Sequence, residues 1–433
     1  MGWIFIVVTA ALGLYMAWNI GANDLANSFG DAVGARAISV RKAVIAAAIC
    51  EFAGSVLVGS HVAETIRSGI VDPQLIMQRP DLAAHEGAAV LALGMACALL
   101  GASIWLNVAT VFGMPVSTTH SIVGGVAGFG IVAAGWHAVK WGKMGEIVAS
   151  WFLSPVLGGL LAFIFFKLIL WAILDRDRPI RAARRYAPVV VFLTATVVVL
   201  ATVYKGLTNV IKDAPWLTGT VAFMMSIGCG LVAALVALVL MRRFLRDDDR
   251  LPLKEQIGRV EKVFAPLVII TSCSVAFAHG ANDVANAIGP LAAVVDILQT
   301  GEVKTNVAVP FWILALGGGG IVLGLATFGY RVMGTIGQKL TQLTPSRGVA
   351  ADLSCSITVL GASKLGLPIS TTHVIVGAII GVGLARGLSA VNKKVTGDIF
   401  GSWFITVPAS AGVAIVLFLL GRAFLLDVIV GYM

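Results

Sequence analysis

The chain has 433 residues, of which 58% are hydrophobic and 12% are charged, and its mean hydropathy is +0.94. Soluble domains carry about 25% charged residues, so this composition excludes a soluble protein and predicts an integral membrane protein. The net charge of +9 does not indicate nucleic-acid binding, because the basic residues lie in short segments between apolar runs.

Apolar runs recur along the chain, and most reach the roughly 20 residues that a helix needs to cross a membrane. We expect crossings at residues 3–20, 43–59, 88–110, 116–135, 146–174, 187–204, 217–241, 263–280, 307–330, 350–366, 369–385 and 398–426. No positive charge precedes the first run, so a membrane span is expected there and not a signal peptide. The predicted fold is therefore all-α and polytopic, with about 12 transmembrane helices.

The basic residues between these runs predict an orientation, because short cytoplasmic loops are enriched in Lys and Arg. With the N-terminus outside, 21 of the 31 Lys and Arg face the cytoplasm and 7 face out, which leaves Lys167, Lys364 and Arg422 within spans. Lys140 and Lys143 are the clearest exceptions. We expect a protein of the cell membrane, plasma or inner, with both termini outside.

Two polar motifs interrupt the apolar runs, and each occurs twice. Gly21–Asn27 reads GANDLAN and Gly280–Asn286 reads GANDVAN, 259 residues further on. Pro115–His120 reads PVSTTH and Pro368–His373 reads PISTTH, 253 residues further on. The nearly constant offset indicates an internal duplication of polar segments.

The duplication predicts three parts: a first repeat of five crossings at 1–175, two linking helices and a charged cytoplasmic loop at 176–262, and a second repeat of five crossings at 263–433. Because each repeat has an odd number of crossings and two helices separate them, the second repeat enters the membrane from the opposite side. Inverted repeats of this kind are frequent in secondary transporters, whose binding sites lie near the midplane where broken or re-entrant helices meet.

The Ser-Thr-Thr segments have the chemistry of an anion site. Each proline is expected to open a helix at its first turn, where unpaired amides and hydroxyls are potential donors and the helix dipole is positive. Two inverted copies bring donors from opposite sides, which suits a tetrahedral oxyanion. An ordinary N-cap role for the hydroxyls is the alternative.

The GANDxAN motifs have the chemistry of a cation site. An ionised Asp near the membrane centre costs about 2.5 to 3.5 kcal/mol, so Asp24 and Asp283 should face a cavity or a cation. Hard cations such as Na⁺ prefer carboxylate and carbonyl oxygens, and the motif glycine would let the backbone bend to supply them. The alternative is that Asn and Asp only cap broken helices.

Together, the paired GANDxAN and P-V/I-STTH motifs resemble the inorganic phosphate transporter (PiT) family, and the shared Ser-Trp-Phe at 150–152 and 402–404 strengthens the resemblance. It implies cation-coupled import of inorganic phosphate, sodium ions as co-transported ligands without any other cofactor, re-entrant hairpins and a homodimer in the lipid bilayer. By position, phosphate would contact Ser117, Thr118, Thr119, Ser370, Thr371 and Thr372. Sodium or another coupling ion would contact Asn23, Asp24, Asn282 and Asp283, with Asn27 and Asn286 as weaker candidates. Apart from the resemblance, Glu51 is a further weaker candidate, because it lies in the second predicted crossing and the second repeat has no acidic counterpart near 310–315.

Several alternatives stay open. The family that the chain resembles also includes proton-coupled phosphate or metal-phosphate symporters and sulfate permeases, and the motifs do not separate these. Neither the stoichiometry nor the affinity of transport follows from the motifs. A passive anion channel is disfavoured by two deep carboxylates, and an enzyme is not expected because no positioned nucleophile and base are seen. His279, where the first repeat has Ile20, introduces a titratable group into one repeat only, and a proton or cation site there is one alternative. The roles of His279, His120, His373 and Lys364 are left undecided.

Overall fold

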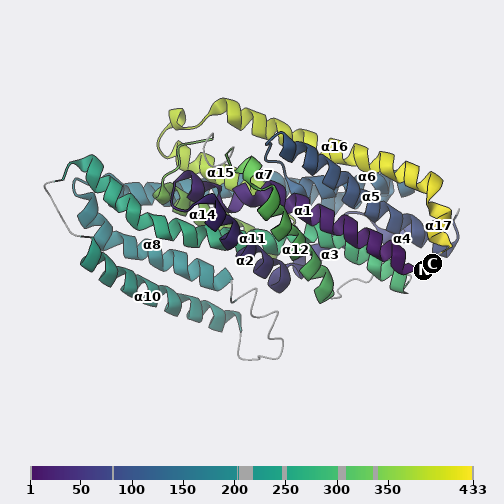
Figure 1. The fold of residues 1–433 in the computed structure, drawn as a ribbon, viewed down its shortest axis with the longest axis horizontal. Coiled ribbons are helices and arrows are strands. Elements are labelled where there is room, and N and C mark those ends of the chain that lie inside the picture. Colours follow the sequence, from purple (N-terminus) through teal and green to yellow (C-terminus); the bar gives the residue numbers. More distant parts are fainter. Residues whose placement is uncertain are drawn as a thin grey trace.

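A computed structural model describes residues 2–79, 82–201, 203, 218–245, 251–300, 309–334 and 340–431. Within this part of the chain the fold is nearly all helical, and the one β contact is an isolated bridge between Val71 and Val139. The long helices run roughly along the longest axis of the molecule, and α1 begins at the same end where the chain finishes (Figure 1).

The order of the helices follows the predicted halves. The first half contains α1 (Gly2–Gly34), α2 (Val40–Val58), α3 (Ser60–Glu64), α4 (Pro73–Met77), α5 (Ala84–Val111), α6 (Thr118–Ala134) and α7 (Trp141–Ile169). Then come α8 (Pro179–Ala201) and α10 (Gly219–Phe244). The second half contains α11 (Leu253–Thr300), α12 (Phe311–Thr327), α13 (Tyr330–Gly334), α14 (Pro345–Lys364), α15 (Thr371–Leu384), α16 (Lys393–Phe424) and α17 (Leu426–Val430).

All twelve predicted apolar runs coincide with helices, but fewer are long enough to span a bilayer. Among the described residues, seven helices are long and apolar enough to cross, or eight if α2 and the bent segment after it count as one span. α6, α12 and α15 have only 17, 17 and 14 residues. The membrane-protein fold is therefore confirmed, whereas the number of crossings stays a prediction.

The charged loop predicted within 176–262 runs from Arg242 to Lys262, and helices enter it from both ends. α10 continues to Phe244 and α11 begins at Leu253, so most of this charged segment is helical. Asp247, Asp248 and Asp249 lie outside the described residues.

Both GANDxAN motifs lie inside unbroken helices, so the expected backbone bend at the motif glycine is wrong. α1 continues for 33 residues through Gly21, and α11 continues for 48 residues through Gly280. A Cβ on Gly21 would lie 2.0 Å from the Ile321 carbonyl oxygen of α12, and one on Gly280 would lie 2.1 Å from the Glu51 carbonyl oxygen of α2. The motif glycines therefore permit close helix packing.

Two helical hairpins carry the Ser-Thr-Thr segments. α5 turns into α6 and α14 turns into α15, and each turn contains a glycine with positive φ, +67° at Gly113 and +65° at Gly366. These two glycines occupy equivalent positions in the repeats, and glycine adopts this left-handed conformation without a Cβ clash.

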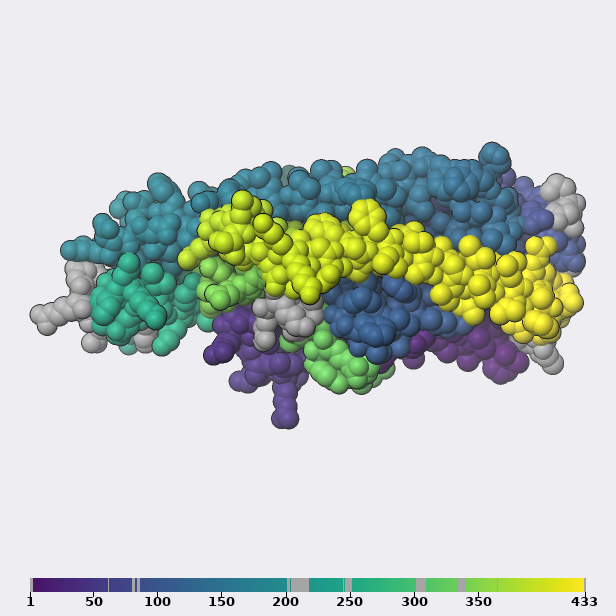
Figure 2. All heavy atoms as spheres, turned by 90° about the horizontal axis from the view of Figure 1, so that it is seen from above, coloured from purple at the N-terminus to yellow at the C-terminus, as the bar shows by residue number. Residues whose placement is uncertain are grey.

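The halves pack against each other in a reciprocal pattern. α1 packs on α12 while α11 packs on α2, and the hairpin helix α6 packs on α16 while α15 packs on α7. Figure 2 shows α16 extended along one face of the molecule in lime to yellow. Each half thus encloses the hairpin of the other, which places both Ser-Thr-Thr segments in the interior.

Candidate functional site

The N-terminal ends of α6 and α15 meet inside the protein. Thr119 Oγ1 donates to the Ile369 carbonyl oxygen (3.1 Å), and Thr372 Oγ1 donates to the Val116 carbonyl oxygen (3.4 Å). Because α6 belongs to one half and α15 to the other, the meeting point joins the two Ser-Thr-Thr segments that the sequence predicts to converge.

Ser117 and Ser370 are the N-caps of these helices. Their Oγ atoms accept hydrogen bonds from the amides of His120 (3.1 Å) and His373 (3.2 Å). The helices begin at Thr118 and Thr371, three residues after each proline, so the expectation that proline opens the first turn is wrong. An extended Ser is what an N-cap requires.

Asp24 and Asp283 accept hydrogen bonds from the hydroxyls of the hairpins. Thr118 Oγ1 and Thr371 Oγ1, one from each hairpin, donate to Asp283 Oδ2 at 3.2 and 2.9 Å. Thr372 Oγ1 lies 3.3 Å from Asp24 Oδ1. The hydroxyl oxygens of the Ser-Thr-Thr segments therefore contact the carboxylate oxygens of the GANDxAN motifs, a proximity that the sequence alone could not establish.

His279 lies between the carboxylates. Its Nε2 atom is 3.3 Å from Asp24 Oδ2 and 3.1 Å from Asp283 Oδ2. Its Nδ1 atom is 3.0 Å from Glu51 Oε2, although without the alignment of a hydrogen bond. Glu51 also accepts a hydrogen bond from Ser28 Oγ at 3.1 Å.

The four asparagines divide into two pairs. Asn27 Nδ2 donates to Asp24 Oδ1 (2.8 Å) and Thr372 Oγ1 (2.9 Å), and Asn286 Nδ2 lies 3.1 Å from Thr119 Oγ1. Each of these two amides contacts the hairpin of the opposite half. Both asparagines, which the sequence predicts only as weaker candidates, therefore contact the hydroxyls of the site directly.

Asn23 and Asn282 contact the backbones of the hairpins. Asn23 Nδ2 donates to Thr110 Oγ1 (2.9 Å) and the Met114 carbonyl oxygen (3.1 Å), and its Oδ1 accepts from the Val116 amide (3.3 Å). Asn282 Nδ2 donates to the Ile369 carbonyl oxygen (3.0 Å). In this conformation the two amides hold the hairpin turns against α1 and α11.

The site is buried and rich in acidic groups. Asp24, Glu51, Asp283 and His279 are each at most 1% exposed. One ligand atom each of Asp24, His279 and Asp283 lies within 4.8 Å of the others, a spacing that a metal ion can bridge. Three carboxylates around one imidazole leave uncompensated negative charge even when the imidazole is protonated, which favours binding of cations.

The sequence missed the central place of His279. Its position directly before the second motif, opposite Ile20 in the first, was the available signal, but only the fold reveals that Glu51 of α2 reaches the same imidazole. The side chain of Lys364 lies outside the described residues.

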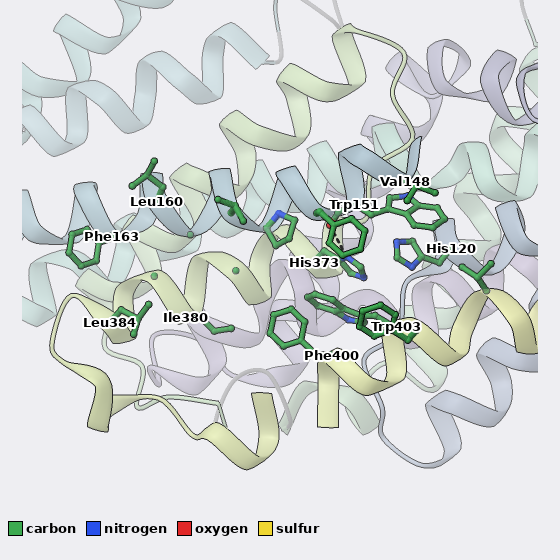
Figure 3. Close-up of a pocket in the computed structure, with 18 residues that line it drawn as sticks. His120, Val148, Trp151, Leu160, Phe163, His373, Ile380, Leu384, Phe400 and Trp403 are labelled. Atoms are coloured by element: carbon green, nitrogen blue, oxygen red, sulfur yellow. Dashed lines mark hydrogen bonds between the residues drawn. The ribbon is translucent and has the colours of Figure 1, made fainter. Parts of the chain in front are cut away.

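His120 and His373 lie behind the site in an aromatic cluster. The His120 ring is 3.7 Å from Trp151 and the His373 ring is 3.4 Å from Trp403, measured between centroids. These four residues line one end of a cavity of about 820 Å³, and Leu160, Phe163 and Leu384 line the other end (Figure 3).

A helical membrane bundle whose interior joins hydroxyls, amides and carboxylates belongs to the class of polytopic membrane transporters. Residues 20–414 match the model of the phosphate transporter family. The chain therefore belongs to the phosphate transporter family, whose members are transporters and not enzymes.

Similar proteins support this assignment over nearly the whole chain. A Pyrococcus abyssi protein that carries the provisional name phosphate permease is 48% identical over 414 residues, which cover 96% of this chain and 97% of that protein. The chloroplastic inorganic phosphate transporter 2-1 of Arabidopsis thaliana is 40% identical over 94% of this chain and 70% of that protein. A solved structure named the sodium-dependent phosphate transporter matches with a TM-score of 0.86 and 42% identity, covering 98% of this chain and all of that one.

Proposed function

We propose that the protein imports inorganic phosphate together with sodium ions by alternating access. The observation that carries this proposal is the convergence of hydroxyls from both hairpins, Thr118 and Thr371, on the single carboxylate oxygen Asp283 Oδ2. A site with donors beside buried carboxylates suits an anion that arrives with cations. Phosphate transport itself is the function of the family to which the chain belongs.

Phosphate is proposed to bind between the N-termini of α6 and α15. The hydroxyls of Ser117, Thr118 and Thr119 on one side and of Ser370, Thr371 and Thr372 on the other would donate to its oxygens, together with free amides of the first helical turns. A carboxylate of Asp24 or Asp283 in its protonated or cation-bound state would adjoin the same oxygens. An acceptor at this position would distinguish phosphate, which can donate a hydrogen bond, from sulfate.

Sodium ions are proposed to bind at Asp24 and Asp283, with Asn27, Asn286 and Glu51 as further oxygen donors. Moving a divalent anion inward against about 100 mV costs about 4.6 kcal/mol, and two sodium ions cancel that cost. Asn23 and Asn282 are proposed to act mainly by holding the hairpin turns in place. The neighbour named a sodium-dependent phosphate transporter supports sodium as the coupling ion.

Alternating access is proposed to arise from inverted repeats. The reciprocal packing of α1 with α12 and α11 with α2, and of the hairpins with α16 and α7, supports this arrangement. We further propose residence in the cell membrane as a homodimer with both termini outside. The site residues are buried in this structure.

A proton-coupled mechanism is the second candidate, and His279 is the observation that favours it. Its imidazole contacts Asp24, Asp283 and Glu51, so a proton on His279 could replace one bound cation. His279→Gln would then remove acceleration of uptake by an inward proton gradient.

The decisive experiment measures labelled phosphate uptake into proteoliposomes with an inward Na⁺ gradient, a matched K⁺ gradient, a proton gradient alone, and excess sulfate. We expect accumulation only with Na⁺ and no inhibition by sulfate. Uptake with the proton gradient alone would show that protons and not sodium ions are the coupling ions. Strong inhibition by sulfate would show that the protein also binds sulfate and would contradict phosphate as the specific substrate.

The same assay tests the proposed cation ligands. Asp24→Asn and Asp283→Asn should each lower uptake by about 100-fold, because truncating one partner of a buried charge pair costs about 2 to 5 kcal/mol of binding free energy, here that of the cation. Asp175→Asn, a change of the same charge at an exposed loop residue, serves as the control. Wild-type uptake by both site variants would exclude them as cation ligands.

A further inference from the structure

Side chains of α10 and α11 line a groove of about 650 Å³. α10 lies at the end of the molecule opposite the chain termini (Figure 1). α8 packs against both of these helices and contributes Val191 to the lining. The groove is separate from the phosphate site, and none of the motifs discussed above lines it.

The lining from α11 forms one face of the helix. Arg259, Lys262, Val263, Pro266 and Leu267 follow each other at the three- and four-residue spacing of neighbouring turns. The two cations lie toward the N-terminal end of this face and the apolar side chains follow. α10 contributes apolar side chains, among them Val236 and Leu240. The groove therefore has a basic mouth and an apolar body.

The surroundings place the mouth at the level of lipid headgroups. α10 has an outer surface of exposed apolar side chains, including Leu231, Val232 and Leu235, which indicates contact with lipid chains. At the charged end of the same helix a second cavity of about 610 Å³ is lined by Arg181, Arg184, Arg185, Leu238 and Arg242. The arginines make this end of the protein strongly positive and attract anionic lipid.

We propose that an anionic phospholipid binds in the groove between α10 and α11. Its headgroup phosphate is held by Arg259 and Lys262, and one acyl chain lies along Val263, Pro266 and Leu267 against α10. Arg259 is also 3.7 Å from Glu255 at the rim, a half-exposed pair that a phosphate can displace at little cost. A free phosphate ion would leave the apolar body unfilled, so the complementarity is that of a lipid.

The proposed lipid groove is lined partly by α11, and the same helix carries His279 and Asp283 of the candidate phosphate site. Pro266 removes a backbone donor from this helix and precedes His279 by 13 residues, about 20 Å along the axis. A lipid that packs on α11 at Pro266 stabilises one position of the helix relative to α8 and α10.

The test compares lipid binding to the full-length protein in detergent by native mass spectrometry. The probes are dioleoylphosphatidylglycerol, dioleoylphosphatidylcholine with the same chains, and glycerol phosphate without chains. Each cation near a lipid surface contributes about a factor of five, so we expect wild-type protein to prefer phosphatidylglycerol over phosphatidylcholine by about 25-fold. Glycerol phosphate should not bind measurably.

Two variants and a matched control assign the effect to the groove. R259Q/K262Q should abolish the preference, and Val236→Trp, which fills the groove from a side chain that is 52% exposed, should weaken binding of both lipids. K254Q/K393Q removes two charges from residues that do not line the groove and should keep the preference. Equal affinity of wild-type protein for the two lipids, equal loss in both double variants, or binding of glycerol phosphate alone would overturn the proposal.

Discussion

Thr118 and Thr371 reach the same carboxylate oxygen from opposite halves of the protein. A hydroxyl donates one proton at a time, so each threonine that contacts Asp283 here is unavailable to an anion. Binding of a cation at Asp283 would release both hydroxyls toward phosphate. At the residue scale, this exchange gives a physical reason why cation binding and anion binding should depend on each other.

Thr371→Val tests this exchange. The variant keeps the shape of the side chain and removes the donor, and loss of a hydrogen bond to a charged group costs about 1.5 to 3 kcal/mol. We expect the KM for phosphate to rise by about tenfold or more in the uptake assay at saturating Na⁺. Thr371→Ser keeps the hydroxyl and should stay close to wild type. An unchanged KM in Thr371→Val would remove this threonine from the phosphate site.

At the scale of elements, the hairpins depend on a glycine at each turn. Gly366→Ala should lower the thermal stability of the purified protein, because a Cβ in the left-handed conformation costs about 1 to 2 kcal/mol. The nearest atom to such a Cβ is Thr65 Oγ1 at 3.9 Å, so the penalty comes from the backbone and not from a clash.

Gly361→Ala is the matched control within α14. No atom lies within 4 Å of a Cβ at Gly361, and the residue is helical, so alanine should leave stability unchanged or raise it slightly. If Gly366→Ala were as stable as Gly361→Ala, the turn would not require its positive φ.

Much of this element-level organisation could be predicted from the sequence. The duplicated motifs predicted two halves and selected residues that meet at the site, because polar groups are easily recognised in an apolar chain. The continuity of α1 and α11 through their motifs could not be predicted, since glycine both bends helices and allows them to pack closely. Only the neighbouring carbonyl oxygens of Ile321 and Glu51 distinguish these functions.

Contacts between segments that are distant in the chain could not be predicted from the sequence either. Glu51 and His279 each lacked a counterpart in the other repeat, but nothing in their spacing indicated that they are neighbours. Likewise, the N-cap role of Ser117 and Ser370 follows from the first residues of the helices, Thr118 and Thr371. The sequence was equally compatible with helices that begin at the preceding prolines.

At the scale of the whole molecule, inverted repeats predict that equivalent loops lie on opposite sides of the membrane. Trp136, between α6 and α7, and Leu388, between α15 and α16, are 60% and 73% exposed. In a background without the five native cysteines, an impermeant maleimide added to intact cells should label Trp136→Cys, and label Leu388→Cys only after permeabilisation.

The pattern of labelling separates inversion from orientation. The reverse pattern would keep the inverted repeats and place the N-terminus inside. Labelling of both residues from the same side would contradict the inversion. Permeabilised cells control for reactivity, because both cysteines should react there.

The imidazole of His279 has no counterpart in the first half, and this asymmetry has a consequence for how tightly the cargo is held on each side of the membrane. In the alternating-access mechanism proposed above, the inward-facing and outward-facing states would arise by exchange of the shapes of the two halves. With Ile20 in one half and His279 in the other, this exchange cannot give two states of equal energy. The protein should therefore hold its cargo with different affinities in the two states, while the ion and phosphate gradients alone set the direction of net transport.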